Sequence, residues 1–247
     1  MIRVGITGGR GFIASHIVNL LKDKRNASLS FFDLPENNLL EPNGALKKFV
    51  RNKDVIIHAA AVNRGSNVDI IGGSVVATHN LVSAMRKYKS TARLIFLSSI
   101  QVETETLYGQ SKKLTEIMLK DFSKRYGIPV SIFRLTNVFG EGCRPFYNSV
   151  VATFCYQVAN GQKITVHPES RNKKINLIYV KDAARMIIKE VFTKQKNLFY
   201  FKRVLSKNEI KVGELAKLIK SFKELKSPKK LKSKFYRDLY KTYLSCF

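Results

Sequence analysis

The chain has 247 residues, of which 44 are Lys or Arg and 18 are Asp or Glu, so its formal net charge is +26. Hydrophobic residues at 45% and charged residues at 25% are typical of a globular protein and exclude wholesale disorder. No apolar run of about 18 residues predicts a membrane-spanning helix, and the first ten residues lack the layout of a secretory signal. We expect a cytoplasmic protein without a transmembrane segment.

The cysteines indicate no disulfide or metal site, and the charge balance leaves the kind of anionic partner open. Cys143, Cys155 and Cys246 are widely spaced and form no Cys-x-x-Cys pair, which predicts neither a disulfide framework nor a metal site. The positive charge favours an anionic partner, because a positive field concentrates phosphate groups near the surface. Nucleic acid, an acidic membrane and a diphosphate ligand would all respond to that field, and lysine-rich solvated faces would give the same count.

Over residues 2–136, short apolar runs alternate with segments that carry apolar residues at helical spacing. This pattern predicts helices at 12–21, 75–88 and 111–126, and strands at 2–7, 27–34, 53–60, 92–99 and 128–136. Such alternation implies a parallel sheet with right-handed crossovers and helices on both faces. The predicted fold class is α/β, a Rossmann-like doubly wound sheet.

After residue 136 the pattern changes to a loop followed by a predicted helix at 149–160, a strand at 163–167 and a strand-to-helix step at 175–191. Two more helices are predicted near 211–222 and 234–244, joined by a solvated linker. We expect residues 1–247 to form one unit. Its dinucleotide-binding core is assigned to 1–136 and parts of 175–200, and its substrate-binding annex and basic tail to 137–174 and 201–247.

A glycine-rich turn follows the first predicted strand. In TGGRGFIA, Gly8, Gly11 and Ala14 form a G-x-x-G-x-x-A pattern where a helix begins. Glycine permits close backbone approach, and the helix N-terminus offers free N–H groups to a diphosphate. Asp33 ends the next strand, where an acidic residue binds the ribose hydroxyls of a dinucleotide. The predicted cofactor-binding residues of this turn and strand are Gly8, Arg10, Gly11, Phe12, Ile13 and Asp33.

The same residues leave the cofactor open between NAD(H) and NADP(H). The Asp33 carboxylate favours NAD because it repels the additional phosphate of NADP. Arg10 favours NADP because a guanidinium pairs well with phosphate. A turn residue before Pro35 and a solvated arginine are the structural alternatives for these two positions.

A candidate proton-transfer set follows the fourth predicted strand. That strand ends at Ser99, and Tyr108 and Lys112 come next, four residues apart and so on one face of a helix. A nearby ammonium favours the ionised phenol, whose pKa of ~10 is otherwise too high for efficient proton exchange at neutral pH. Ser99 lies at the carboxyl end of the strand, where it would hydrogen-bond a substrate carbonyl. The set predicts hydride-transfer chemistry with Tyr108 as the acid or base.

These motifs resemble those of the extended short-chain dehydrogenase/reductase family of nucleotide-sugar epimerases, dehydratases and reductases. The resemblance rests on TGGRGFI, HAAA, SVVATHNL, FLSS, YGQSK, RLTNVFG and YVKDAA. It implies that Ser99, Tyr108 and Lys112 form the catalytic triad. It also implies that Ala59, Ala60 and Lys112 bind the cofactor, Lys112 by holding the nicotinamide ribose. It further implies a homodimer formed through the helix of the Tyr-x-x-x-Lys motif and its neighbour. We expect no nucleic acid partner, because a dinucleotide and a UDP-sugar would already bring two diphosphates to the positive charge.

Further passages are similar to the CapF-type reductases of capsule and O-antigen synthesis, notably the segment 137–166 and FYRDLYKTYLS. This resemblance implies reduction of the 4-keto group of a UDP-2-acetamido-2,6-dideoxy-hexos-4-ulose, on the route to UDP-N-acetyl-L-fucosamine. The family likeness also favours NADP(H) as the cofactor. It places Asn137, Arg144, Asn148 and Ser149 at the nucleotide-sugar side, although Asn148 or Ser149 would also make a good helix cap. CapF-type proteins continue after the FYRDLYKTYLS passage into a zinc-binding cupin domain, whereas this sequence ends at Phe247.

Two positions depart from the wider family. Ser74 stands where the family often has an Asn that holds a proton-relay water, and Ile175 stands where many members have an Arg that binds the diphosphate.

The sequence leaves two other functions open. A nucleotide-sugar 4-epimerase or dehydratase would use the same triad, and a non-catalytic protein of this fold would use its basic surface to bind polyanions.

Overall fold

The computed structural model describes residues 1–225, 231 and 233–247, and these residues form two compact units. Unit 1 comprises residues 1–135 and 184–204, and unit 2 comprises residues 136–183 and 205–247. Each unit has its own β-sheet. The predicted solvated linker between the two C-terminal helices spans 223–233, and its residues 226–230 and 232 lie outside the described residues.

Unit 1 is built on a six-stranded parallel sheet with the order β2-β1-β3-β4-β5-β8. Its strands are β1 Ile2–Thr7, β2 Ala27–Phe32, β3 Val55–His58, β4 Arg93–Ser99, β5 Val130–Leu135 and β8 Phe199–Val204. The order reverses between β1 and β3, and doubly wound sheets bind ligands beyond the carboxyl ends of the strands at such a point. The predicted α/β doubly wound fold is confirmed.

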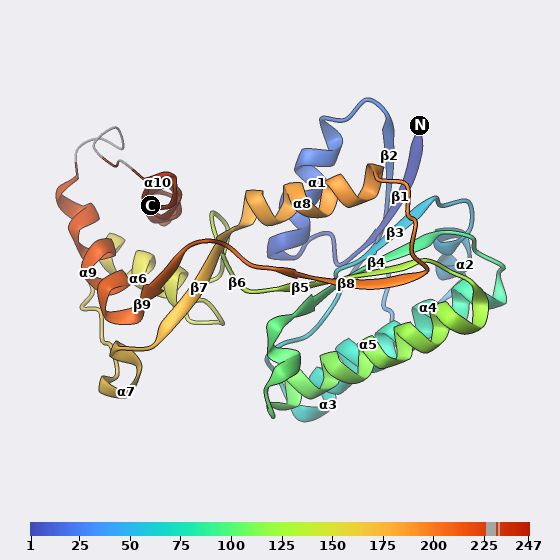
Figure 1. Cartoon of the computed structure of the whole chain (residues 1–247), viewed down its shortest axis with the longest axis horizontal. Coiled ribbons are helices and arrows are strands. Elements are labelled where there is room, and N and C mark those ends of the chain that lie inside the picture. The colour runs from blue at the N-terminus through green and yellow to red at the C-terminus, as the bar shows by residue number, and fades with distance from the viewer. Residues whose placement is uncertain (226–230, 232) are drawn as a thin grey trace. The chain divides into compact units, whose positions relative to one another are not determined.

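Helices cover both faces of this sheet (Figure 1). One face carries α1 (Phe12–Lys22) and the unit 1 part of α8 (Val180–Phe192). On the other face, α2 (Gly44–Val50), α4 (Ala77–Lys87) and α5 (Leu107–Tyr126) pack on strand residues such as Ile56, Leu94 and Phe96 in one apolar core. The apolar residues at helical spacing in the sequence are therefore those that cover the sheet.

The helix predicted at 75–88 begins earlier, because α3 (Asn67–Ile71) and a π-helical turn, η1 (Gly72–Val76), continue it upstream. By length and composition alone the stretch Asn67–Lys87 could cross a membrane, since a window within it reaches a mean hydropathy of 1.2. Its side chains Ala77, Leu81 and Met85 lie in the core of unit 1. A core helix of a folded α/β unit meets the same criterion.

Unit 2 has a three-stranded sheet with the order β6-β7-β9, in which β6 is parallel and β9 antiparallel to β7. Its strands are β6 Asn137–Phe139, β7 Lys174–Tyr179 and β9 Glu209–Lys211. Its helices are α6 Val150–Ala159, α7 Pro168–Arg171, α9 Val212–Ser221 and α10 Lys234–Leu244. The helices predicted at 149–160, 211–222 and 234–244 are thus confirmed.

The strand predicted at 163–167 is wrong. Ile164 is buried and its neighbours are exposed, as in a strand, but the segment makes no ladder. The strand β7 offers it no edge, because β6 occupies one side and β9 the other. The predicted loop at 137–148 likewise contains β6, whose pairing with β7 no local pattern indicates.

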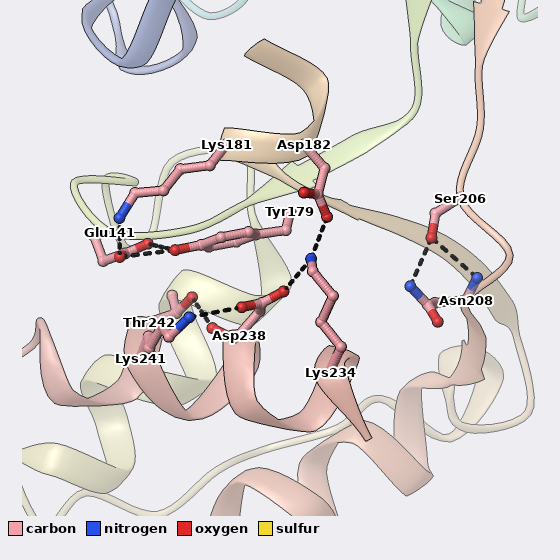
Figure 2. A network of polar contacts seen from close by, with 10 residues as sticks. All are labelled: Glu141, Tyr179, Lys181, Asp182, Ser206, Asn208, Lys234, Asp238, Lys241 and Thr242. Carbon is pink, nitrogen blue, oxygen red and sulfur yellow. Dashed lines mark hydrogen bonds and ion pairs between the residues drawn. The ribbon is translucent and has the colours of Figure 1, made fainter. Parts of the chain in front are cut away.

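Helix α10 is attached by ion pairs to the first turn of α8, which directly follows β7 (Figure 2). Lys234 bridges Asp182 and Asp238, and Lys241 also pairs with Asp238. The Tyr179 hydroxyl donates to Glu141, which also pairs with Lys181. Burial and the Glu141 carboxylate both raise the pKa of Tyr179, so the phenol stays protonated and keeps donating.

Candidate active site

The glycine-rich turn joins β1 to α1 and has the geometry that a bound diphosphate requires. Gly8 has φ +70°, and a Cβ at this position would lie 2.6 Å from the backbone nitrogen of Ala60. Gly11 is the N-cap of α1 and has no side chain to cap the first turn, which contains Phe12 and Ile13. Free N–H groups at the positive end of an 11-residue helix can therefore face an anion.

A cavity of about 250 Å³ lies beside this turn, at the carboxyl ends of β1, β2 and β3. Four of the predicted cofactor-binding residues, Gly8, Arg10, Asp33 and Ala60, line this cavity. The other lining residues are Phe32, Leu34, Asn37, Asn38, Leu39, Leu40, Ala61, Val62, Gly73 and Ala77. Sequence reasoning missed these, although the position of 34–40 directly after β2 was a usable signal. A mostly apolar pocket with an acidic group at one end fits an adenosine.

Lys112 is the most deeply buried candidate catalytic residue. It is 1% exposed, its Nζ donates to the Leu97 carbonyl at 3.0 Å, and Nζ lies 4.5 Å from the centre of the Phe96 ring. Burial lowers the pKa of Lys112 to about 7, against the opposing effect of Glu116. Nζ also lies 5.9 Å from the centre of the Tyr108 ring, so the two side chains share one face of α5. The Lys112 charge can therefore act on the phenol of Tyr108.

Tyr108 and Ser99 are linked through the backbone between them. Ser99 ends β4 and its Oγ accepts a hydrogen bond from the Gln101 backbone nitrogen at 3.1 Å. The Gln101 carbonyl lies so close to α5 that a Cβ on Gly109 would come within 2.1 Å of it. Thr106 caps α5 at the Gly109 nitrogen, which brings Tyr108 into the first turn of the helix. The glycine after Tyr108 thus allows the helix to begin against the Ser99 loop.

A buried ion pair between Glu116 and Arg134 lies one helical turn beyond Lys112. Glu116, one turn after Lys112 on α5, accepts three hydrogen bonds from Arg134 on β5 at 2.6–3.2 Å. It also accepts a hydrogen bond from Ser98, next to Ser99, at 2.7 Å. Glu116 therefore connects α5 to both β4 and β5, and sequence reasoning did not single it out.

His58 lies fully buried at the carboxyl end of β3, and its HAAA context was the only signal for it in the sequence. Thr78 donates its hydroxyl proton to the Ser74 carbonyl at 2.6 Å, so its oxygen accepts from His58 Nε2 at 2.8 Å. His58 Nδ1 then accepts from the Thr7 hydroxyl at 2.7 Å. Burial, with a smaller effect of the Lys112 charge, lowers the pKa of His58 to about 3. His58 is a neutral structural link between β1, β3 and α4.

Ser74 lies in the π-helical turn η1, and its buried Oγ has no hydrogen-bond partner within the part of the chain that the structure describes. π-Turns within helices occur frequently at functional sites. A buried hydroxyl without a partner is costly unless a water or ligand satisfies it. Position 74, where the wider family often has Asn, therefore also carries a buried polar side chain in this protein.

The four predicted substrate-binding residues all lie in unit 2, between β6 and the start of α6. Asn137 Nδ2 donates to the Asn176 carbonyl at 3.2 Å, and Arg144 lies 5.2 Å from the centre of the Tyr147 ring. Ser149 is the N-cap of α6 and accepts from Ala152, so it has the capping role that its position allowed. Asn148, directly before it, is exposed.

Residues 4–197 match the sequence profile of the NAD dependent epimerase/dehydratase family. A UDP-2-acetamido-2,6-beta-L-arabino-hexul-4-ose reductase from Pseudomonas aeruginosa is 34% identical over 249 residues, which cover 99% of this chain and 64% of that protein. The chain thus spans less than two thirds of that relative's length.

Two solved structures have the same fold. The capsular polysaccharide assembling protein CapF from Staphylococcus aureus superposes with a TM-score of 0.80 and 27% identity, over 100% of this chain and 65% of that one. The UDP-glucose 4-epimerase of Thermus thermophilus, solved with NAD, gives a TM-score of 0.81 and 21% identity over 99% of both chains. The second likeness supports the fold alone.

Proposed function

Since the chain belongs to the NAD dependent epimerase/dehydratase family, we propose that it is a nucleotide-sugar reductase that uses a nicotinamide cofactor. Its substrate is a UDP-2-acetamido-2,6-dideoxy-hexos-4-ulose, and the group that it reduces is the 4-keto group of this sugar. The similarity to the Pseudomonas aeruginosa reductase over nearly the whole chain supports this substrate class. The observation that carries the chemistry is the buried Lys112 beside Tyr108, on the helix that begins against the Ser99 loop.

In this proposal each residue has a separate task. The cofactor, when bound, supplies the hydride that reduces the C4 carbonyl carbon. Ser99 donates a hydrogen bond to the carbonyl oxygen, and Tyr108 gives its phenolic proton to the alkoxide that forms there. Lys112 stabilises the phenolate left behind, and with a pKa of about 7 it can pass on a proton near neutral pH. The turn at Gly8 and Gly11 holds the cofactor diphosphate, with Phe12, Ile13, Ala59 and Ala60 beside it.

On the substrate side, we assign Arg144 and Asn148 to contacts with the nucleotide sugar, with Asn137 and Ser149 next to them. Arg144 carries a charge suited to a diphosphate and Asn148 exposes an amide. Ser149 already caps α6, so its contribution is to position Asn148. Replacing Arg144 with Met should raise KM more than it lowers kcat, because the residue binds substrate away from the reacting atoms.

The test is oxidation of reduced nicotinamide cofactor by purified protein supplied with the 4-keto sugar. Tyr108→Phe should lower kcat by about 10²–10⁴-fold while leaving the circular dichroism spectrum and the binding of cofactor intact. Turnover by Tyr108→Phe at the wild-type rate would refute the mechanism. A 4-epimerase or dehydratase on the same triad would return the hydride, so net consumption of cofactor separates these activities from reduction.

The proposal extends to assembly and location. The helix α5 exposes Leu114 at 50% and Ile117 at 55%, which supports a homodimer formed through this helix and α4. Ile117→Lys should then convert a dimer to a monomer in light scattering, and a wild-type monomer would refute the assembly. We place the reaction in the cytoplasm, in capsule or O-antigen precursor synthesis. Loss of L-fucosamine from surface polysaccharide after gene deletion tests that role.

A further inference from the structure

The guanidinium of Arg10 lies at the rim of the adenosine-sized cavity but is already engaged. Its Nη1 donates to the Leu34 carbonyl at 2.6 Å, and its Nη2 pairs with Glu36 Oε1 at 3.2 Å. The Glu36 hydrogen bonds, including one from Arg10, lower the pKa of this carboxyl, so it is ionised at neutral pH. The arginine that lines the cavity is therefore neutralised by a side chain just outside it.

The Asp33 carboxylate is also held by hydrogen bonds, but its partners are uncharged backbone groups. Its Oδ1 accepts from the Gly9 backbone nitrogen at 3.0 Å and its Oδ2 from the Arg10 backbone nitrogen at 3.2 Å. Neither bond uses a charged partner, so these contacts leave the negative charge of Asp33 uncompensated. Each carboxylate oxygen keeps a second lone pair that can accept a hydroxyl proton of a ribose.

Together these contacts place the Asp33 carboxylate and the Arg10 guanidinium at the rim of the cavity, with the Glu36 carboxylate just outside it. A 2′-phosphate on the adenosine ribose would meet Asp33 directly, and Arg10 beside it already donates two of its N–H groups to Leu34 and Glu36 and shares its charge with Glu36. A ribose with free 2′- and 3′-hydroxyls would instead find acceptors in Asp33. Of the two indications that conflict in the sequence, Asp33 keeps its charge, whereas Arg10 shares its charge with a third residue, Glu36.

We propose that the cavity selects NAD over NADP and that Glu36 is a specificity-determining residue, because it withholds Arg10 from the 2′-phosphate. This inference rests on the proposed function, which requires a dinucleotide at this site. Asp33 contributes the larger part of the discrimination, since it would touch the phosphate. Glu36 contributes the smaller part, because its pair with Arg10 is exposed, at 60% and 65% for the two side chains, and exposed pairs are weak.

The test is isothermal titration calorimetry with ADP-ribose and its 2′-phosphorylated form, which differ only in the 2′-phosphate and contain no nicotinamide. Wild-type protein should bind ADP-ribose at least about tenfold more tightly. Glu36→Gln should tighten binding of the phosphorylated probe by about two- to fivefold and leave ADP-ribose binding unchanged. Glu41→Gln, at a nearby exposed acid outside the cavity lining, is the matched control and should change neither.

A double variant shows whether Glu36 acts through Arg10. In an Arg10→Met background the gain from Glu36→Gln should vanish, and a gain that persists would overturn the role given to Glu36. Equal or tighter binding of the phosphorylated probe by the wild-type protein would overturn the preference for NAD. Failure of both probes to bind would instead overturn the dinucleotide site and with it the proposed function.

Discussion

Two lysines, one in each unit, have the same side chain in opposite environments. In unit 1, Lys112 is buried against Phe96 and a backbone carbonyl, and burial lowers its pKa to about 7. In unit 2, burial alone would lower the pKa of Lys234, but its hydrogen bonds to Asp182 and Asp238 outweigh this and raise it. One lysine can change its protonation state near neutral pH, and the other cannot.

The difference follows from where the carboxylates are placed. Glu116 lies one turn from Lys112, yet its oxygens are hydrogen-bonded to Arg134 and Ser98. Asp182 and Asp238, by contrast, both form ion pairs with Lys234 (Figure 2). A buried ammonium without a direct carboxylate partner suits proton transfer, whereas a paired one suits attachment of a helix.

The largest expected effect comes from removing the tuned lysine. Lys112→Met should lower kcat by about 10²–10⁴-fold, because the phenolate of Tyr108 loses the charge that stabilises it. Steady-state oxidation of reduced cofactor measures this. The control is Lys113→Met at the neighbouring exposed position, which should keep the wild-type rate within about twofold. Equal activities of the two variants would show that the Lys112 environment is not catalytic.

Removing the Glu116 carboxylate, which pairs with Arg134, should lower the stability of the fold. Glu116→Ala leaves a guanidinium with a 12% exposed side chain without its main partner, and breaking such a buried pair costs about 3–5 kcal/mol. Urea unfolding followed by circular dichroism gives the free energy. Glu105→Ala, which removes an exposed carboxylate in the preceding loop, should cost less than about 0.5 kcal/mol. A cost below about 1 kcal/mol for Glu116→Ala would contradict its role in fixing α5 to β5.

The lowered pKa of Lys112 also predicts a pH dependence of folding. Between its folded value of about 7 and its ordinary value of 10.5, the unfolded chain binds more protons at this site, so unfolding free energy should rise with pH. Relative to Lys112→Met, the wild type should gain about 2–3 kcal/mol between pH 7 and pH 9.5. Unfolding curves for both proteins across this range test it. Parallel pH profiles would mean that Lys112 is protonated in the folded protein throughout.

The local pattern of the sequence predicted much of unit 1. The strands at the glycine turn and at Ser99 are continuous apolar runs, and the four-residue spacing of Tyr108 and Lys112 gives one helix face whatever surrounds it. These features depend on neighbours in the chain, so periodicity and spacing are sufficient to find them. The cavity residues Gly8, Arg10 and Asp33 follow for the same reason, whereas Ala60 was predicted only from the resemblance of HAAA to a family motif.

What the sequence did not predict depends on partners far along the chain. The environment of His58 comes from Thr7 and Thr78, and the commitment of Arg10 comes from Glu36. The segment 163–167 alternates like a strand but finds no free edge. No pattern within the C-terminal segment indicates that Lys234 will meet Asp182, which is 52 residues away.

The smallest expected effect tests the attaching lysine itself. Lys234→Met should cost only about 0.5–1 kcal/mol, because Lys234 is exposed and Asp238 keeps a second partner in Lys241 at 3.1 Å. Removing both lysines should cost about 3–5 kcal/mol, more than the sum of the single losses, since the buried Asp238 then loses both of these cations. Urea unfolding of the two single variants and the double variant gives the coupling. Strictly additive losses would mean that Asp238 tolerates burial without a charged partner, and the contrast between a lysine kept for attachment and one tuned by burial would no longer hold.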